Sequence, residues 1–384
     1  MTARRTIAVF TGTRAEYGLL YWLLRDMQED SSIDLRLIVS GTHLVTGFGR
    51  TISDIERDGF DISAQVDMLL ASNTSVSVVK SMAVGMLGFA DALERLEPDA
   101  VLILGDRYEA LAMAQSAMIM GVPIVHLHGG EVTEGAYDDA IRHGITKMAS
   151  LHCVAAEPYR QRVIQLGEDP SRVFTVGTLG LEHLKRTTLL SRQELSTQLT
   201  FDLTRDYCVV TLHPETHALE QTKQTLEALI TALSEYPDLS VLWTYPNADQ
   251  GSQEIIETIE TLQKRQPERF KAVANLGSQR YLSAIAGAKA VVGNSSSGLI
   301  EAPALHKPTL NLGSRQYGRL LADSVVSAGI DDINTALAKV LSKCFAQQCL
   351  AVTNPYGDGD VSRRIIQLLK TEALSTRKTF HDVG

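Results

Sequence analysis

The chain has 384 residues, of which 44% are hydrophobic and 21% are charged, and its formal net charge is -9 at pH 7. This length exceeds the usual size of one hydrophobic core and predicts two domains. The negative charge and the lack of a Lys/Arg-rich run exclude a nucleic-acid partner, because backbone phosphates need a concentrated basic surface.

The sequence indicates neither a targeting segment nor a membrane span. Its start, MTARRTIAVF, runs directly into a strand pattern, and no stretch approaches 18 uninterrupted apolar residues. The cysteines form no Cys-x-x-Cys pair, which favours buried, reduced thiols over a disulfide or a zinc site. They are Cys153, Cys208, Cys344 and Cys349. We therefore expect a cytoplasmic protein with no membrane partner and no bound metal.

The first half of the chain alternates short apolar runs with amphipathic stretches of helical length. This alternation is typical of parallel strands joined by crossover helices. The predicted strands cover residues 6–10, 35–39, 100–104, 124–127, 152–155 and 173–176. The predicted helices cover residues 16–28, 75–96, 109–120, 140–150 and 158–166.

The second half repeats the alternation. Its predicted strands cover residues 207–212, 239–244, 270–275, 290–293 and 309–312, and its predicted helices cover 219–235, 252–265, 281–286 and 298–304. We expect an N-terminal domain over residues 1–186, a linker over 187–206 and a C-terminal domain over 207–358. Residues 359–384 are expected to form a terminal helix that packs back on the first domain.

Titratable and hydroxyl residues follow nearly every predicted strand. In an open parallel α/β sheet, ligands bind beyond the carboxyl ends of the strands, where helix N-termini present free N–H groups. The segments at these positions are TGTR (11–14), SGTH (40–43), GDR (105–107), HGGE (128–131), HPE (213–215), NSSSG (294–298) and GSR (313–315). Because both halves contribute, we expect an anionic ligand in a cleft between two domains.

Some of these residues also have plain structural explanations. Arg14 is equally explained as a solvated surface arginine, and Asp106 as a helix N-cap. Asp138 and Asp139 begin a predicted helix, where the helix dipole favours acids. Glu131 follows two glycines that permit close backbone approach, and packing explains a carboxylate there poorly.

The run NSSSG opens a predicted helix with Glu301 on its first turn. Small hydroxyl residues and N–H groups at a helix start suit a phosphate, and a carboxylate one turn later can accept two ribose hydroxyls. A capping box formed by Glu301 is the alternative. The chain has no G-x-x-x-x-G-K-[ST] motif and no G-x-G-x-x-G motif after its first strand, which argues against ATP hydrolysis and NAD chemistry.

Six motifs, taken in order, resemble the UDP-N-acetylglucosamine 2-epimerase family. The resemblance is to its hydrolysing branch, which makes N-acetylmannosamine for sialic acid synthesis, and it covers essentially the whole chain. The motifs are TGTRAEYG, SGTHL, LGDRYEALAMA, HLHGGEVTEGAYDDAIRHGITKMA, VTLHPET and GNSSSGLIEAPALHKPTLNLGSRQYGR.

The resemblance implies a GT-B-like α/β fold of two Rossmann-like, doubly wound parallel-sheet domains. A UDP-sugar would lie in the interdomain cleft, with no cofactor and no metal. The catalytic residues would be Asp106, Glu131, one of the pair Asp138 and Asp139, and His213. The residues expected to bind the UDP-sugar are Arg14, His43, Arg142, Asn294, Ser295, Ser296, Ser297, Glu301, Arg315 and Arg319.

The implied reaction converts UDP-N-acetylglucosamine and water into N-acetylmannosamine and UDP. It would proceed by elimination to a 2-acetamidoglycal and hydration with inversion at C2. UDP-2,4-diacetamido-2,4,6-trideoxyglucose, the precursor of legionaminic-type acids, is an alternative substrate, because only the pocket around C4 and C6 would differ. A non-hydrolysing epimerase, a GT-B glycosyltransferase and a non-catalytic UDP-sugar-binding protein are further alternatives. We expect a homo-oligomer, either a dimer or a tetramer.

Overall fold

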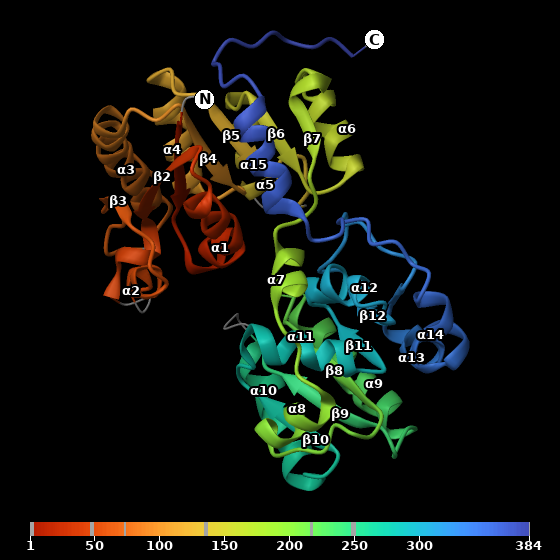
Figure 1. Cartoon of the computed structure of the whole chain (residues 1–384). Coiled ribbons are helices and arrows are strands. Elements are labelled where there is room, and N and C mark those ends of the chain that lie inside the picture. The colour runs from red at the N-terminus through yellow and green to blue at the C-terminus, as the bar shows by residue number, and fades with distance from the viewer. Residues whose placement is uncertain are drawn as a thin grey trace. The chain divides into compact units, whose positions relative to one another are not determined.

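The computed structural model describes residues 4–46, 50–72, 74–133, 137–215, 218–246 and 251–383. The chain divides into two compact units. In Figure 1 the first is coloured from red to yellow, with its C-terminal segment in blue, and the second from green to blue. The first unit comprises Met1–Glu182 together with Gly359–Gly384, and the second comprises His183–Asp358. Each unit therefore has its own sheet and its own core.

The first unit, within its described residues, contains a seven-stranded parallel sheet in the order β3-β2-β1-β4-β5-β6-β7. Its strands are β1 (Arg5–Thr11), β2 (Ile33–Ser40), β3 (Ile62–Val66), β4 (Ala100–Leu104), β5 (Ile124–Leu127), β6 (Leu151–Val154) and β7 (Val173–Thr175). The direction in which strands are added reverses between β1 and β4. Such a reversal is where ligands bind in doubly wound sheets.

Helices cover both faces of this sheet. They are α1 (Arg14–Glu29), α2 (Ile52–Arg57), α3 (Ser75–Leu96), α4 (Tyr108–Ile119), α5 (Tyr137–Met148), α6 (Glu157–Gln165) and α15 (Val361–Thr371), with 3₁₀ turns η1 (Gly41–Leu44) and η3 (Pro170–Arg172). Helix α7 (Gly180–Arg186) begins in the first unit and ends in the second. Because side chains alternate along a strand, Ile7 and Val9 of β1 pack with α1 and α15, whereas Ala8 and Phe10 pack with α3 and α4.

The second unit contains, within its described residues, a six-stranded parallel sheet in the order β10-β9-β8-β11-β12-β13. Its strands are β8 (Tyr207–Thr211), β9 (Ser240–Thr244), β10 (Phe270–Val273), β11 (Ala290–Gly293), β12 (Thr309–Leu312) and β13 (Val325–Ala328). Its helices are α8 (Arg192–Leu199), α9 (Leu219–Ser234), α10 (Ser252–Arg265), α11 (Gly277–Gly287), α12 (Glu301–Ala304), α13 (Ile333–Leu341) and α14 (Lys343–Cys349), with 3₁₀ turns η4 (Ser296–Gly298) and η5 (Ile330–Asp332). Here the order reverses between β8 and β11.

The doubly wound class predicted from the sequence is confirmed, and the differences lie at the edges. The edge strands β3 and β13 were not predicted, because ISAQV and VVSA are short and largely lack the continuous burial of the central strands. The helix predicted over 298–304 is instead the 3₁₀ turn η4 followed by the four-residue α12. Cys344 is exposed rather than buried, while all four cysteines are free.

Two segments outside the alternation of strands and helices, residues 187–206 and helix α15, each pack into a hydrophobic core. The expected linker, residues 187–206, carries α8 and belongs to the second unit, where Leu195, Leu199 and Phe201 pack with Tyr207. Its apolar residues recur every four positions, which is enough to bury one face of a short helix. Helix α15 contacts α1 and adds Ile365 to the first core (Figure 1).

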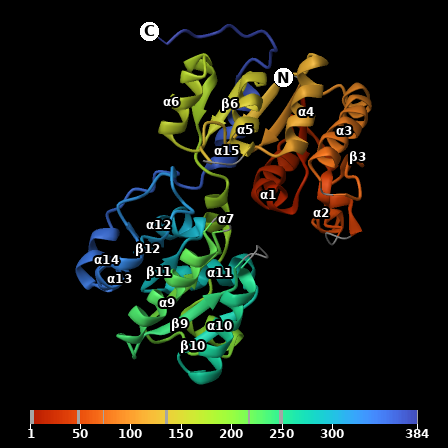
Figure 2. The same cartoon turned by 180° about the vertical axis from the view of Figure 1, so that it is seen from behind.

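Helix α3 is long and apolar enough, by length and composition, to cross a membrane, although the sequence analysis predicts no such segment. Its two faces explain this composition. Phe89 and Leu93 are buried in the core, whereas Val79 and Leu87 are 66% and 72% exposed. Helix α4 lies beside α3 (Figure 2), and its Ile119 is 78% exposed. We call Val76, Val79, Leu87 and Ile119 the α3–α4 surface.

Candidate functional site

In each sheet the strand order reverses between two strands, so the ends of four strands are candidate positions for a ligand. In the first unit, β1 is followed by Thr13 and Arg14, and β4 is followed by Gly105 and Asp106. In the second unit, β8 is followed by His213, and β11 by Asn294. Each unit therefore presents polar residues where a doubly wound sheet binds its ligand.

Arg142 is the centre of the polar residues in the first unit. It lies on α5, its side chain is 5% exposed, and its guanidinium pairs with Asp106. Its Nη1 atom is 3.1 Å from Asp139 Oδ1 and 2.9 Å from the carbonyl oxygen of Glu131. Its Nη2 atom donates to Thr133 Oγ1 at 2.9 Å. One buried cation thus ties together residues that follow β4 and β5 and residues of α5.

A sharp turn after β5 aims Glu131 toward this cation. His128 and Gly130 both adopt left-handed backbone conformations, with φ of 62° and 80°. A Cβ atom at Gly130 would lie 2.4 Å from the carbonyl oxygen of Tyr159, so glycine is required there. The Glu131 carboxylate accepts a hydrogen bond from His128 Nδ1 at 3.1 Å. We call Asp106, Glu131, Asp138 and Asp139 the acid cluster.

Burial perturbs the carboxyl group of Asp106. It raises the pKa of Asp106 against the opposing effect of Arg142, and the negative charges of Asp138 and Glu131 add to the rise. A carboxyl group with a raised pKa exchanges protons closer to neutral pH than an exposed aspartate does. The cluster therefore has the composition required for proton transfer.

The structure distinguishes Asp138 from Asp139, between which the sequence did not decide. Asp139 accepts hydrogen bonds from Arg142 and from the backbone N–H of Thr133 at 2.9 Å, and it lies 3.4 Å from His143 Nε2. Within the described ranges, no hydrogen bond or ion pair holds Asp138, and its charge acts on Asp106. Asp139 therefore fixes the start of α5, and Asp138 is the candidate for chemistry.

The turns after β1 and β2 each hold one residue that was predicted to bind the ligand, and the two residues differ in exposure. Arg14 is exposed as the first residue of α1, which Thr13 and Glu16 cap with a capping box. His43 is fully buried, with its ring nitrogens 3.1 Å from Thr11 Oγ1 and 2.8 Å from Thr51 Oγ1, and burial lowers its pKa to about 4. His43, predicted to bind the ligand, is a buried, neutral residue in contact with Thr11 and Thr51, and its ligand role stays a prediction.

Asn294 organises the corresponding turns of the second unit. Its side chain accepts from the backbone N–H of His213 at 2.7 Å and donates to the His213 carbonyl at 2.8 Å. Its own carbonyl oxygen accepts from Arg315 Nη1 at 3.2 Å and from Gln316 Nε2 at 2.8 Å. Asn294 is 1% exposed, so its role is to hold His213 and Arg315 rather than to meet a ligand directly.

The serine turn that follows Asn294 is rich in hydroxyl groups. The Ser295 hydroxyl accepts from the N–H of Ser297 at 3.4 Å, and Ser296 begins η4. Burial raises the pKa of Glu301, on α12, to about 7. Its Oε2 atom is buried and meets no hydrogen-bond partner among the described residues.

Three residues with clear contacts are not among the predicted site residues, although Glu215 belongs to the HPE segment. Thr133 bonds to Arg142, Glu215 accepts from the backbone N–H of Ser314 at 2.9 Å, and the Tyr281 hydroxyl bonds to Ser297. The partner of Glu215 is distant along the chain, so no spacing marks that pair. Arg319 is half-buried near the end of the same loop as Arg315. Over the described ranges, no group of three or more His, Cys, Asp and Glu residues is arranged to hold a metal ion.

Comparison with known proteins agrees with this geometry. The model of the UDP-N-acetylglucosamine 2-epimerase family matches residues 25–370. The chain is 39% identical to the GDP/UDP-N,N'-diacetylbacillosamine 2-epimerase (hydrolyzing) of Campylobacter jejuni, with 90% of each chain covered. It is 35% identical to the polysialic acid biosynthesis protein P7 of Escherichia coli, covering 98% of this chain and 97% of that protein.

A third relative is the UDP-N,N'-diacetylbacillosamine 2-epimerase (hydrolyzing) of Legionella pneumophila, which is 34% identical with 97% of each chain covered. Among solved structures, the fold is similar to that of the S. aureus MnaA-UDP co-structure, with a TM-score of 0.76, 18% identity, and coverage of 99% of this chain and 100% of that one. The family match over most of the chain and the identity to these relatives show that the protein belongs to the UDP-N-acetylglucosamine 2-epimerase family and is a hydrolysing 2-epimerase.

Proposed function

We propose that the protein converts a UDP-linked 2-acetamido sugar and water into UDP and the free sugar with inverted configuration at C2. The observation that carries the proposal is that the buried Arg142 binds the carboxylates of Asp106 and Asp139 and the main-chain carbonyl of Glu131. A C2–H bond is barely acidic, so its cleavage needs a carboxylate that is held in place rather than one that is merely near.

In the first step, a carboxylate of the acid cluster removes the C2 proton while the C1–O bond breaks. The electrons of the C2–H bond form the C1=C2 double bond of a 2-acetamidoglycal, and UDP leaves with the electrons of the C1–O bond. Glu131 and Asp106 are our candidates for this proton transfer, because they follow two different strand ends and the charge of Glu131 acts on Asp106. Asp138 is the third candidate.

In the second step, water adds to C1 and a carboxylic acid delivers a proton to the opposite face of C2. The proton that the water loses passes to another carboxylate of the cluster. Acids on more than one side of the sugar are needed for this inversion, and the cluster draws its members from the β4 exit, the β5 exit and α5. Because burial raises the pKa of Asp106, its carboxyl group keeps a proton to higher pH than an exposed aspartate does, which suits it to the role of proton donor.

We assign UDP binding to the second unit. The serine turn at 295–297 offers hydroxyl and N–H groups to the diphosphate, and the unpaired oxygen of Glu301 accepts a ribose hydroxyl. His213 and Arg315, both held by Asn294, supply donors to the departing phosphate. Arg14, exposed at the start of α1, is our candidate for a further phosphate contact from the first unit.

We propose UDP-N,N'-diacetylbacillosamine as the sugar nucleotide. Its support is that the relatives at 39% and 34% identity carry this substrate in their names. UDP-N-acetylglucosamine is the second candidate, because it is the substrate in the name of the family. The two differ only at C4 and C6 of the sugar, so the same acid cluster serves either one.

The purified protein should be incubated in deuterated water with each of three substrates and followed by proton NMR. These are UDP-N,N'-diacetylbacillosamine, its GDP analogue and UDP-N-acetylglucosamine. Release of a free, C2-deuterated manno-configured sugar, fastest from the first substrate, supports the proposal. Faster release from UDP-N-acetylglucosamine would transfer the assignment to that sugar. A UDP-linked product, or none from any of them, would contradict the reaction.

A second experiment tests the place of Glu131. The Glu131→Gln variant keeps the hydrogen bond from His128 but cannot accept a proton. We expect its kcat to fall roughly 10²–10⁴-fold, with the Kd of UDP unchanged by calorimetry. A near-normal kcat would remove Glu131 from the proton-transfer groups.

We propose that the protein works in the cytoplasm. We also propose that its α3–α4 surface pairs with a second copy of the chain. At about 1.5 Å per residue, α3 is roughly 33 Å long, and exposed apolar stripes of this size mark interfaces. Light scattering should give a dimer or tetramer, and Leu87→Lys with Val79→Lys should lower the mass to that of the monomer. A monomeric parent protein would contradict this interface.

A further inference from the structure

His126 lies beneath the acid cluster and takes no part in the reaction as proposed. It is the third residue of β5 and is fully buried. Its Nε2 atom is 2.8 Å from the carbonyl oxygen of Gly105, and its Nδ1 atom is 3.1 Å from Thr146 Oγ1. Both ring nitrogens are therefore used inside the protein.

The partners of His126 belong to the segments that carry the acid cluster. Gly105 directly precedes Asp106, and Thr146 lies four residues after Arg142, so it shares a face of α5 with it. The third segment is the turn that leads to Glu131. A Cβ atom at Gly129 would lie 3.1 Å from His126 Nδ1 and 3.0 Å from Thr146 Oγ1, so the turn rests directly on this pair.

The hydrogen-bond partners also fix the proton on the ring. A carbonyl oxygen only accepts, so Nε2 must carry the proton that is donated to Gly105. Nδ1 then accepts from the hydroxyl of Thr146. Burial lowers the pKa of His126 to about 3, which keeps the ring neutral at physiological pH. The imidazole is a rigid spacer with one donor and one acceptor in set directions.

We propose that His126 is a positioning residue that holds the Gly105–Asp106 turn, the Gly129–Glu131 turn and the Arg142 face of α5 in register. The inference rests on the proposed function, because it assigns His126 the task of placing the groups that move the C2 proton. A displacement of about 1 Å in such groups costs on the order of 10²-fold in rate. The bond to Gly105 is the critical one, because it acts on the residue next to Asp106.

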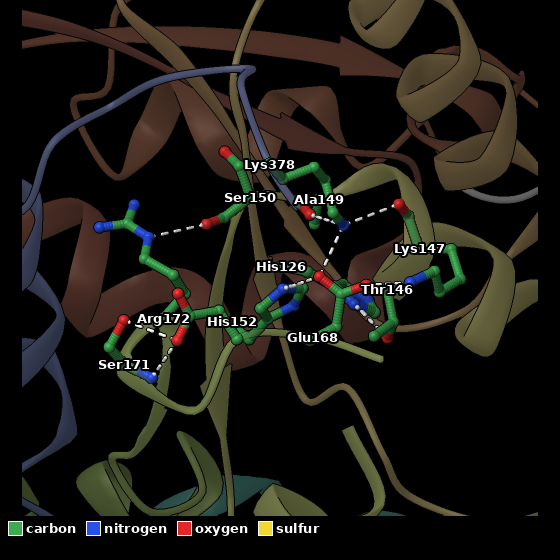
Figure 3. A network of polar contacts seen from close by, with 11 residues as sticks. His126, Thr146, Lys147, Ala149, Ser150, His152, Glu168, Ser171, Arg172 and Lys378 are labelled. Atoms are coloured by element: carbon green, nitrogen blue, oxygen red, sulfur yellow. Dashed lines mark hydrogen bonds and ion pairs between the residues drawn. The ribbon is translucent and has the colours of Figure 1, made fainter. Parts of the chain in front are cut away.

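His152 provides a matched control. It pairs in register with His126 on the neighbouring strand β6 and is equally buried. Figure 3 shows the two imidazoles close together, with His126 reaching Thr146 and His152 reaching Glu168. Glu168 also receives Lys147 Nζ and Lys378 Nζ, each at 2.6 Å. The described partners of His152 therefore lie outside the three segments of the acid cluster.

Two substitutions separate the two bonds of His126. The amide nitrogen of Gln reaches the place of Nε2, so His126→Gln retains the donor to Gly105 and loses the acceptor for Thr146. The side chain of Asn reaches only the place of Nδ1, so His126→Asn retains the acceptor and loses the donor. Thr146→Val removes the hydroxyl alone and leaves the ring intact.

The test is the kcat of each variant beside its Kd for UDP and its free energy of unfolding. We expect His126→Asn to lose roughly 10²-fold in kcat, and His126→Gln and Thr146→Val roughly tenfold or less, all with unchanged UDP affinity. His152→Asn should lower stability and keep kcat per folded molecule.

Equal losses in His126→Asn and His152→Asn, or a His126→Asn enzyme with parental kcat, would overturn the positioning role. Long-range ¹⁵N NMR of the parent supplies a readout without substrate, and we expect the Nε2–H form of His126 from pH 5 to 8. A charged ring or the Nδ1–H form would also overturn it. A parent protein that turns over none of the sugar nucleotides would instead refute the proposed function.

Discussion

The turns of the two units use opposite means to present polar groups. In the first unit, Arg142 is 4% exposed and is surrounded by carboxylates that follow β4 and begin α5. In the second unit, Asn294 holds the turns after β8 and β11 through four neutral or singly charged hydrogen bonds. One region is held by ion pairs, and the other by an amide and hydroxyl groups.

This difference indicates that the polar residues of the first unit suit proton transfer and those of the second unit suit ligand binding. Burial raises the pKa of Asp106 despite its ion pair with Arg142, and a raised pKa prepares a carboxyl group for proton transfer. The N–H and hydroxyl groups of the serine turn, together with the Arg315 guanidinium, suit the binding of a phosphate. Substitutions should therefore affect turnover in the first unit and ligand affinity in the second, and the following predictions test that division.

The largest effect is expected at Asp106. The Asp106→Asn variant removes a carboxyl group with a raised pKa but keeps the shape that faces Arg142. We expect kcat to fall about 10³-fold, and the Kd of UDP to stay within about twofold, measured by steady-state kinetics and calorimetry. A loss of UDP affinity as large as the loss of kcat would break the division between the units.

A smaller effect separates the two neighbouring aspartates. Asp139→Ala removes one acceptor of Arg142 and the described acceptor of the Thr133 N–H, so we expect the free energy of unfolding to drop by about 2 kcal/mol. Asp138→Ala should change it by about 0.5 kcal/mol or less, because no described partner depends on it. Urea denaturation of both variants measures this contrast, and equal losses would contradict the assignment of Asp139 to structure.

In the first unit, Glu16 should make the free energy of unfolding depend on pH. Burial raises the pKa of Glu16 to about 7, while its Oε2 atom accepts from the N–H groups of Gly12 at 2.8 Å and Thr13 at 3.1 Å. Between pH 4.5 and 7 the folded protein binds the Glu16 proton and the unfolded chain releases it, so stability falls as pH rises. The Glu16→Gln variant lacks this loss.

We therefore expect Glu16→Gln to gain stability relative to the parent by up to about 1.4 kcal/mol per pH unit across that range. Urea denaturation at pH 4.5, 5.5, 6.5 and 7.5 measures the difference. A constant difference at all four values would show that the capping bonds, and not the buried charge, control the effect of Glu16.

The smallest effect is expected at Glu301 in the second unit. Glu301→Ala removes the unpaired buried oxygen, and we expect the Kd of UDP to rise about tenfold with kcat at saturating substrate nearly unchanged. Calorimetry with UDP measures the first quantity. An unchanged Kd would show that this oxygen does not meet the ribose.

The sequence was sufficient for the fold class and for the strand ends, because both depend on local patterns. Buried strands such as β4 and β8 are continuous apolar runs, and each is followed by polar residues. The edge strand β13 was not found, since its half-exposed side chains give no such run. Residues 187–206 look like a linker because their apolar positions are few, yet those few are enough to cover one edge of the second core.

The sequence predicted which polar residues belong to the candidate site, but not which of them contact one another. Arg142 and Asp106 were both predicted, but their ion pair depends on α5 facing the exit of β4, which no local pattern encodes. For the same reason His43 was expected to meet a ligand, although Thr11 and Thr51 occupy both of its nitrogens. Long-range pairing decides whether a polar residue serves a ligand or the core.

Helix α15 makes the order of synthesis matter for folding. It contacts α1 and buries Val361, Ile365 and Leu369 in the first core, yet it is translated after the whole second unit. A ribosome-bound chain therefore exposes the apolar face of α1 while the second unit is already able to fold. The first core is therefore complete only after α15 has been synthesised.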